Sequence, residues 1–313
     1  MSQSQVGDMD NPRWTTTDIP SQQGRTAVIT GTGGLGYETA LALARAGADV
    51  IIAGRNADKG AEAVQKVRAA VADAQVCFEV LDLASLASIE AFARRLPRPH
   101  IDVLINNAAV MAPPKRHQTA DGFELQLGTN YLGHFALTAR LLPRLRKAHQ
   151  ARVISVSSIA ARDGVLDFDD LEAEKRYQPM VVYSQSKLAN LMFAFELQRR
   201  SEAAGWGVAS IAAHPGVSRT ELIPNSMGLF TPYGLLRAIV GPILFQSAAQ
   251  GALPTLFAAT APGAVPGGYY GPRKLNELRG YPTEAKVPPQ ATDAVAAARL
   301  WAESERLTQV AFT

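Results

Sequence analysis

A short apolar segment followed at once by a glycine-rich loop and a helix constrains the fold more than any other stretch of this chain. Residues Thr26–Ile29 are predicted to form a strand, and the loop Gly31–Gly36, GTGGLG, follows it directly. Apolar residues at helical spacing run over Tyr37–Ala46, and Gly47 suits the end of that helix. A strand, a glycine turn and a helix in this order indicate the first unit of a parallel α/β sheet.

Strands and helices alternate along the rest of the chain. This alternation predicts an α/β fold, a doubly wound and mostly parallel Rossmann-type sheet with helices on both faces. We expect one domain over residues 25–313, after a loosely ordered extension over residues 1–24 in which Trp14 and Ile19 could contact the surface. The further expected strands are 50–53, 76–81, 103–105, 152–156, 208–212 and 269–270, and the further helices are 57–71, 85–96, 122–142 (ended by Pro143), a helix from Tyr183, 248–259 and 291–307.

Composition agrees with a folded domain and argues against several classes of function. Of the 313 residues, 47% are hydrophobic and 19% are charged, which is enough apolar material for a sizeable core. The net charge is +3 without a run of Lys and Arg, so we expect no nucleic-acid partner. The five histidines show no metal-ligand spacing, so we expect no metal site. The single cysteine, Cys77, excludes a disulfide within the chain.

The sequence predicts no transmembrane segment. The N-terminus lacks the basic-then-apolar pattern of a signal peptide. The most apolar stretch, Gly228–Phe245, is interrupted by Pro232, Arg237 and Pro242. We therefore expect a cytoplasmic protein.

The glycine loop is the first candidate cofactor site. Glycines let a backbone approach a pyrophosphate, and the N-terminus of the following helix attracts its charge. Two alignments of the loop agree on Gly31 for the tight turn and Gly36 for close helix–strand packing. They differ over which backbone meets the pyrophosphate, since one alignment assigns the close approach to Gly33 and the other to Gly34. We expect Gly33 to make the close approach and Gly34 to accept a small side chain. The candidate contacts are Gly31, Thr32, Gly33, Gly34, Leu35 and Gly36.

The end of the second predicted strand indicates the type of dinucleotide. NAD sites carry an Asp or Glu about 20 residues after the glycine loop, but Gly54-Arg55-Asn56 stands at this place. A guanidinium pairs well with a 2′-phosphate, so Arg55 favours NADP(H), with NAD(H) as the second choice. The alternative is that Arg55 is a solvated loop residue.

Two more strand ends lie where a parallel sheet places its ligands. The carboxylate of Asp82, in Asp82-Leu83, either accepts from an adenine amino group or caps the next helix, a role for which Ser85 competes. Asn107-Ala108-Ala109 lies beside the expected path of the cofactor, although Asn side chains also bond to loop backbone. With Asn56, these residues are candidate cofactor contacts.

Tyr183 and Lys187 are the candidate catalytic pair, because they lie one turn apart on the same side of a predicted helix. A free phenol has a pKa near ~10, and a neighbouring ammonium lowers it. The pair therefore indicates a general acid, with Tyr183 as proton donor and Lys187 lowering its pKa. Taken alone, such a pair is far more often an ordinary surface feature.

Together these motifs resemble the short-chain dehydrogenase/reductase family. In the segments NNAAVM, GTNYLGHFALT and YSQSKLANLMFAFEL the chain is similar to the retinol-dehydrogenase-like and protochlorophyllide-reductase-like branch. The glycine loop is one residue shorter than the family's, and Ala109 stands where the family has glycine. The match covers roughly residues 25–220 and consists of Thr30-Gly31…Gly34-Leu35-Gly36, Asp82-Leu83, Asn106-Asn107-Ala108-Ala109, Asn130, Ser157-Ser158, Tyr183-x-x-x-Lys187 and Pro215-Gly216.

The resemblance implies NAD(P)H and a catalytic tetrad, which falls on Asn130, Ser158, Tyr183 and Lys187. Tyr183 would protonate a substrate oxygen as hydride arrives from the nicotinamide, and Ser158 would hold that oxygen. Lys187 would also contact the nicotinamide ribose, and Asn130 would bend its helix and anchor a water that relays protons to Lys187. The resemblance further implies Pro215-Gly216 as cofactor contacts and a homodimer or homotetramer.

We therefore predict an NADP(H)-dependent oxidoreductase that interconverts a carbonyl and an alcohol on an apolar small molecule. The alternatives are a reductase of an activated C=C bond and a non-catalytic dinucleotide-binding sensor or scaffold. Residues 217–245 are apolar and directly follow Gly216, so we expect a C-terminal lobe there that covers the substrate pocket. An extra core helix or a dimer contact is the alternative for this segment.

Overall fold

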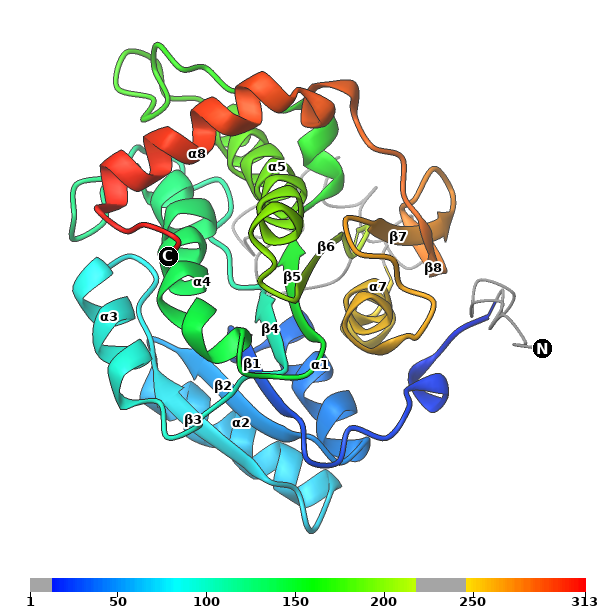
Figure 1. The fold of residues 1–313 in the computed structure, drawn as a ribbon. Coiled ribbons are helices and arrows are strands. Elements are labelled where there is room, and N and C mark those ends of the chain that lie inside the picture. The colour runs from blue at the N-terminus through cyan, green and yellow to red at the C-terminus, as the bar shows by residue number, and fades with distance from the viewer. Residues whose placement is uncertain (1–12, 218–245) are drawn as a thin grey trace, which may run out of the picture.

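The computed structural model describes residues 13–217 and 246–313, which are built around an eight-stranded sheet (Figure 1). The strand order is β3-β2-β1-β4-β5-β6-β7-β8. All described neighbours pair in parallel except β7 and β8, which are antiparallel. This order confirms the doubly wound, mostly parallel α/β sheet. The strands are β1 (Thr26–Thr30), β2 (Asp49–Gly54), β3 (Val76–Val80), β4 (Val103–Asn106), β5 (Ala151–Val156), β6 (Val208–Ala213), β7 (Tyr269–Lys274) and β8 (Arg279–Glu284).

Helices cover both faces of the sheet because its central strands are apolar on both sides. Along the fully buried strand β1, Val28 contributes to one core, whereas Ala27 and Ile29 contribute to the other. Successive side chains of a strand point to opposite faces, so one strand supports two layers of helices. The core that contains Val28 is covered by α3 (Leu86–Arg95), α4 (Gly133–Leu145) and α5 (Pro179–Ala204), and the other core by α1 (Gly34–Arg45), α2 (Ala57–Ala70) and α7 (Ala248–Thr260).

The last helix, α8 (Ala294–Thr308), lies outside α4 and α5 (Figure 1). Its Trp301 packs against Phe135 of α4 and Phe193 of α5, with ring centroids 5.1 and 5.8 Å apart. Phe312, beyond the helix, lies 4.4 Å from Trp301. Such aromatic pairs add roughly 0.5–1.5 kcal/mol each beyond their burial. The C-terminal segment is therefore fixed to α5, which carries the predicted tetrad residues Tyr183 and Lys187. It is also fixed to α4, which begins shortly after the predicted tetrad residue Asn130.

The helical region predicted over 122–142 differs at both ends. Glu124 pairs with Gln118 in an isolated bridge, so the first residues are not helical. A π-helical segment, Leu127–Leu132, then leads directly into α4. Pro143 lies inside α4 and does not end it. Its missing N–H removes only one hydrogen bond in the last turn, so the helix continues to Leu145.

Two other elements were mispredicted for local reasons. Helix α1 begins at Gly34, before the predicted Tyr37, because Gly33 already serves as its N-cap residue. Strand β8 was not predicted, because Gly280 and Pro282 interrupt its pattern. It lies at the edge of the sheet, where strands tolerate proline.

The N-terminal segment lies against the domain from Arg13 onward. Trp14 is 1% exposed and packs edge-on against Phe257 of α7, with ring centroids 5.4 Å apart. Thr15 caps a short 3-10 helix at Thr16–Asp18. Residues 1–12 lie outside the described part of the chain, as does the predicted lobe over 217–245 apart from Val217.

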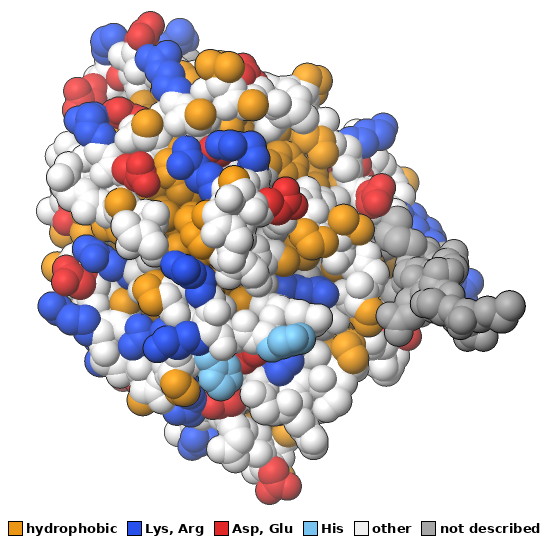
Figure 2. All heavy atoms as spheres, viewed as in Figure 1, with side chains coloured by type: hydrophobic (Ala, Val, Ile, Leu, Met, Phe, Trp, Pro, Cys, Tyr) orange, Lys and Arg blue, Asp and Glu red, His pale blue; other side chains and the backbone are white. Residues whose placement is uncertain are grey.

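Charges of both signs are mixed on the surface that Figure 2 shows. That face therefore lacks the single-sign field typical of nucleic-acid binding. Among the helices in the described residues, none is both long and apolar enough to cross a membrane.

Candidate active site

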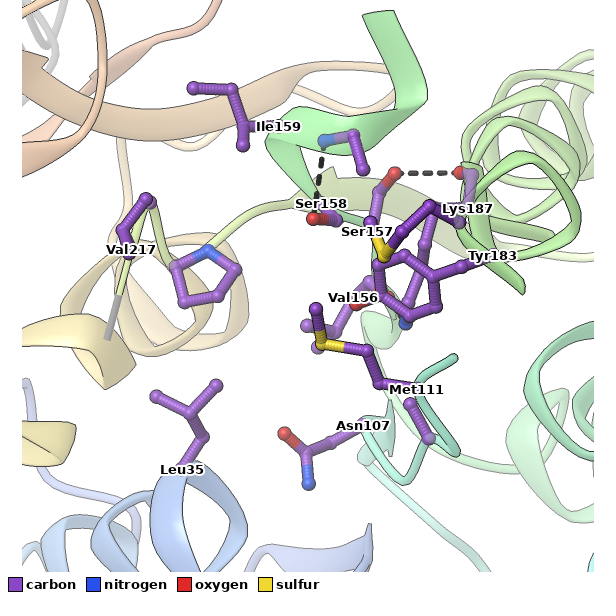
Figure 3. A pocket seen from close by; sticks show the side chains of 15 residues that line it. Leu35, Asn107, Met111, Val156, Ser157, Ser158, Ile159, Tyr183, Lys187 and Val217 are labelled. Carbon is purple, nitrogen blue, oxygen red and sulfur yellow. Dashed lines mark hydrogen bonds between the residues drawn. The ribbon is translucent and has the colours of Figure 1, made fainter. Parts of the chain in front are cut away.

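A cavity of about 210 Å³ opens at the carboxyl ends of β4, β5 and β6. This edge of a parallel sheet is where ligands bind. Asn107 follows β4, Ser158 follows β5, and Pro215 follows β6. Figure 3 shows Tyr183 and Lys187, from α5, on the side of the cavity opposite Val217. The lining is mostly apolar and comprises Leu35, Asn107, Ala109, Met111, Val156, Ser157, Ser158, Ile159, Ala160, Met180, Tyr183, Lys187, Pro215, Gly216 and Val217.

The hydroxyls of Tyr183 and Ser158 form the polar centre of this cavity. Tyr183 is 7% exposed. Burial raises the pKa of its phenol, and a hydrogen bond with Ser158 opposes that rise. Ser158 is the N-cap of the 3-10 helix Ile159–Asp163, where its Oγ accepts from the N–H of Ala160 at 3.2 Å. The cap fixes the serine side chain at the position where it meets the tyrosine.

Lys187 lies next to Tyr183, but its effect on the Tyr183 pKa differs from the expected one. Its Nζ donates to the carbonyl of Val156 at 3.1 Å and lies 5.8 Å from the centre of the Tyr183 ring. The expected lowering of the Tyr183 pKa by Lys187 is not observed, because burial sets the direction of that pKa. Burial also lowers the pKa of Lys187 to about 8, so this side chain can both hold and release a proton near neutral pH.

Asn130 is fully buried and is not among the residues that line the cavity. It lies within the π-helical segment Leu127–Leu132. Its Oδ1 accepts from the N–H of Val110 at 2.7 Å, and its Nδ2 donates to Val110 O at 2.9 Å and Ser186 Oγ at 3.0 Å. Asn130 thus ties the segment after β4 to α5, the helix of Tyr183. The structure brings Ser158, Tyr183 and Lys187 together in one cavity, whereas Asn130 lies outside its lining and contacts α5 through Ser186.

Sequence reasoning missed a buried network around Thr30 and His134. Thr30 Oγ1 accepts from the N–H groups of Asn107 and Ala108, both at 2.9 Å. Burial lowers the pKa of His134 to about 4, so its imidazole is neutral at neutral pH. The Nδ1 of His134 lies 2.8 Å from the carbonyl of Asn130 and must donate to it, so its Nε2 accepts from Thr30 Oγ1 at 2.9 Å. This network joins the strand before the glycine loop to the π-helical segment.

The glycine loop differs from its predicted geometry in one respect. Gly34 has a φ of +52°, in the left-handed region, whereas Gly33 has a φ of −129° in ordinary extended backbone. The expectation that Gly34 accepts a side chain more easily is therefore wrong as far as the backbone is concerned. The close packing expected at Gly36 is present, because a Cβ there would lie 2.5 Å from the carbonyl of Gly31.

A second cavity, also about 210 Å³, lies between the glycine loop and α2. Lys59 and Lys66 line it, and the Nζ of Lys66 lies 2.6 Å from Glu62. Arg55, at the end of β2, is exposed and does not belong to its lining. Sequence reasoning missed Lys59, which lies one turn into the helix that Asn56 caps. The lining comprises Thr32, Gly33, Gly34, Tyr37, Lys59, Glu62, Ala63 and Lys66.

The remaining cofactor candidates satisfy local backbone. Asp82 Oδ1 accepts from the N–H of Ala84 at 3.0 Å, and Ser85 rather than Asp82 caps α3. Leu83 is buried in the core. The Nδ2 of Asn107 donates to the carbonyl of Thr30 at 2.8 Å, so this side chain both supports the loop and lines the main cavity.

The sheet order, the glycine turn and a cavity at the strand ends define a dinucleotide-binding α/β protein. The family model of short chain dehydrogenases matches residues 25–227. Polyprenol dehydrogenase of Mus musculus is 41% identical over 300 residues, which are 93% of this chain and 85% of that protein. Retinol dehydrogenase 12 of Homo sapiens is 42% identical over 283 residues, 89% of this chain and 84% of that protein.

A solved structure agrees with these relatives. An uncharacterised protein from Mycobacterium paratuberculosis is 42% identical, with a TM-score of 0.80 over 96% of this chain and 99% of that one. The chain belongs to the short-chain dehydrogenase family, in its retinol-dehydrogenase-like branch. It is therefore an NAD(P)-dependent oxidoreductase.

Proposed function

We propose that this protein interconverts a carbonyl and an alcohol on an apolar small molecule, with NADP(H) as the preferred cofactor and Tyr183 as the proton donor. The observation that carries the proposal is the Tyr183–Ser158 hydroxyl pair, which is the polar centre of an otherwise apolar cavity. Two hydroxyls can hold one oxygen atom, and an apolar wall excludes water from it.

In this proposal, bound NADPH supplies the hydride, and side chains of the protein donate and replace the proton. Ser158 donates a hydrogen bond to the substrate oxygen and fixes its position. Tyr183 transfers its phenolic proton to that oxygen. The raised pKa of Tyr183 keeps the phenol protonated at neutral pH, which is the form that carbonyl reduction requires. Lys187, with a pKa of about 8, can replace the lost proton.

The residues around the glycine loop fit a dinucleotide with an extra phosphate. Thr32, Gly33 and Gly34 of the loop line the cavity beside α2. Lys59 and Lys66 line that cavity, and Arg55 lies at the nearby end of β2. Cations in place of the Asp or Glu of NAD sites favour the 2′-phosphate of NADP(H).

The lining of the main cavity supports an apolar substrate. Met111, Ile159, Met180 and Val217 contribute apolar surface. The relatives are named for polyprenol and retinol, both apolar isoprenoid alcohols, and we propose a substrate of that chemistry. We also propose that the apolar residues after Val217, which lie outside the described part of the chain, contribute to substrate binding. Assembly as a homodimer or homotetramer likewise remains our prediction.

The test is a turnover screen with the purified protein. Loss of NADPH absorbance is measured with retinal, long-chain enals, aliphatic ketones, quinones and steroids, and the products are identified by chromatography. We expect reduction of a C=O group on an apolar member and none with Tyr183→Phe. A product reduced at C=C would support the alternative reductase, and NADPH binding without any turnover would support the sensor or scaffold.

A further inference from the structure

The turn between β7 and β8 has an unusual backbone. Leu275, Asn276 and Glu277 have φ values of +52°, +54° and +67°, all in the left-handed region. Asn adopts this region readily, but Leu and Glu rarely do. Strained backbone of this kind persists where surrounding contacts hold it, often beside functional sites. The turn lies outside residues 25–227, the part of the chain that the family model matches.

The strained turn places the Glu277 carboxylate inside the protein, where the side chain is 9% exposed. Its Oε2 lies 2.9 Å from His214 Nε2 and 2.6 Å from Arg162 Nη2. Its Oε1 accepts from the N–H of Lys286 at 3.0 Å. Both oxygens are therefore engaged, so the carboxylate has a fixed position.

Through His214, Glu277 holds the Pro215-Gly216 wall of the main cavity. His214 Nδ1 accepts from the N–H of Gly216 at 3.2 Å, so the imidazole proton lies on Nε2 and is donated to Glu277. The same turn touches this wall directly, since Leu278 O accepts from the N–H of Val217 at 2.9 Å. Gly216 has a φ of +62°, and a Cβ there would lie 2.3 Å from Leu278 O.

Through Arg162, Glu277 also holds the neighbouring wall, which follows β5. Arg162 belongs to the 3-10 helix Ile159–Asp163, which Ser158 caps. Its Nη1 donates to the carbonyl of Asn276 in the same turn, at 3.3 Å. Ser158 and Ile159 line the cavity on this side. One carboxylate thus joins the wall that contains Ser158 to the wall that contains Gly216.

We propose that Glu277 is a positioning residue for hydride transfer. It fixes the distance between Ser158, which we propose holds the substrate oxygen, and Pro215-Gly216, which the family resemblance implies as cofactor contacts. Glu277 does not line the cavity, so it acts through His214 and Arg162 and touches neither substrate nor cofactor. The inference rests on the roles proposed above for Ser158 and Pro215-Gly216.

Two variants test the ion pair between Glu277 and Arg162, one at each partner. Glu277→Gln keeps the shape and an acceptor for His214 but removes the charge that faces Arg162. Arg162→Met removes the cation, whose side chain is 24% exposed, and leaves the Glu277 carboxylate with its hydrogen bonds to His214 and the N–H of Lys286. Glu196→Gln is the matched control, because this side chain is 3% exposed and also pairs with two arginines, Arg199 and Arg200, but lies outside the cavity lining.

The first measurement needs no cofactor. Hydrogen exchange of segments 158–164 and 208–217 should be faster in Glu277→Gln and Arg162→Met than in wild type, and unchanged in Glu196→Gln. The second is single-turnover hydride transfer from saturating NADPH. It should slow by about tenfold to a hundredfold, because small misplacement of reacting groups costs that much, while the NADPH dissociation constant changes little.

The proposal is wrong if both variants match Glu196→Gln in exchange and in transfer rate. Should Glu277→Gln fail to fold, Arg162→Met decides by the same two measurements. Failure of the proposed function looks different: Tyr183→Phe would turn over normally, and the exchange data on the cofactor-free protein would still report whether Glu277 joins the two walls.

Discussion

The catalytic end and the phosphate end of the candidate cofactor site are built in opposite ways. At the catalytic end Tyr183 is 7% and Lys187 2% exposed, and each has a hydrogen-bond partner within the protein. At the phosphate end Arg55 and Lys59 are exposed, and the Lys66–Glu62 pair is more than half exposed. Buried, bonded groups are placed before a ligand arrives, whereas exposed cations are ordered by the ligand itself. Substitutions should therefore affect the rate of chemistry at one end and cofactor selectivity at the other.

The largest expected effect is at the catalytic end. Tyr183→Phe keeps the ring and removes the proton, so kcat should fall by about 10² or more, the usual range of acid–base catalysis. The NADPH dissociation constant should barely change, because the substitution is isosteric and far from the phosphates. Steady-state kinetics and a fluorescence titration check the two halves of this prediction. Normal turnover in Tyr183→Phe would contradict the mechanism.

The second effect concerns the buried network that supports the catalytic end. The pKa of His134 is lowered from 6.5 to about 4 in the folded chain, so the unfolded chain binds its proton more readily. The contribution of the neutral imidazole to the free energy of unfolding is therefore complete above pH ~6.5 and is lost as the pH drops toward 4. Between pH 7 and 5 the loss is about 2 kcal/mol. Urea unfolding at both pH values should show a shallower loss in His134→Gln.

The exposed His149 provides the control for that measurement. His149→Gln should keep the wild-type pH dependence. If His134→Gln and the wild type lose the same free energy between the two pH values, the buried network does not contain a neutral imidazole.

The fold and the centre of the site could be predicted because they depend on local patterns. A parallel sheet brings the ends of its strands to one edge, so motifs at strand ends converge there, as Asn107, Ser158 and Pro215 do. The Tyr183–Lys187 spacing placed both residues on one side of α5. Strand β8 was missed because edge position, not apolar alternation, allows its proline and glycine.

The supporting contacts could not be predicted because they join distant positions. Thr30 and His134 are 104 residues apart, and His214 and Glu277 are 63 apart. Nothing in a lone histidine or glutamate indicates its partner before the chain folds. Lys59 was missed for a different reason. It lies on the surface of α2, where the sequence does not distinguish it from an ordinary solvated lysine.

The third effect belongs to the phosphate end. A charge-assisted contact contributes roughly 1.5–3 kcal/mol, so the wild type should prefer NADPH to NADH by about tenfold or more, and Arg55→Asp should remove that preference. Added salt should weaken it, because the cation is exposed. Dissociation constants for both cofactors check this. Arg94→Asp makes the same charge change on α3 and is the control, since the Arg94 side chain is 73% exposed. Equal binding of both cofactors by the wild type would contradict the role of Arg55.

The smallest effect lies in the glycine loop, where the two ends of the site meet. Gly34 has a left-handed φ of +52°, and a side chain there costs about 1–2 kcal/mol. Gly34→Ser should therefore lower the free energy of unfolding by about 1 kcal/mol. Gly33 is extended and is the N-cap of α1, a position where serine bonds to the free N–H groups of the first turn. Gly33→Ser should keep or slightly raise the stability.

Both glycines line the cavity beside α2, so NADPH binding can show which of them lies against the cofactor. If the backbone of Gly33 lies against the pyrophosphate, Gly33→Ser weakens NADPH binding although the protein remains stable. Unfolding in urea and NADPH titration of the same two variants supply both numbers. Wild-type stability in Gly34→Ser would show that the left-handed turn is not required. Wild-type NADPH affinity in Gly33→Ser would instead assign the close approach to Gly34. Gly34 and Gly36 would then correspond to the second and third glycines of the family's loop, in a compressed turn.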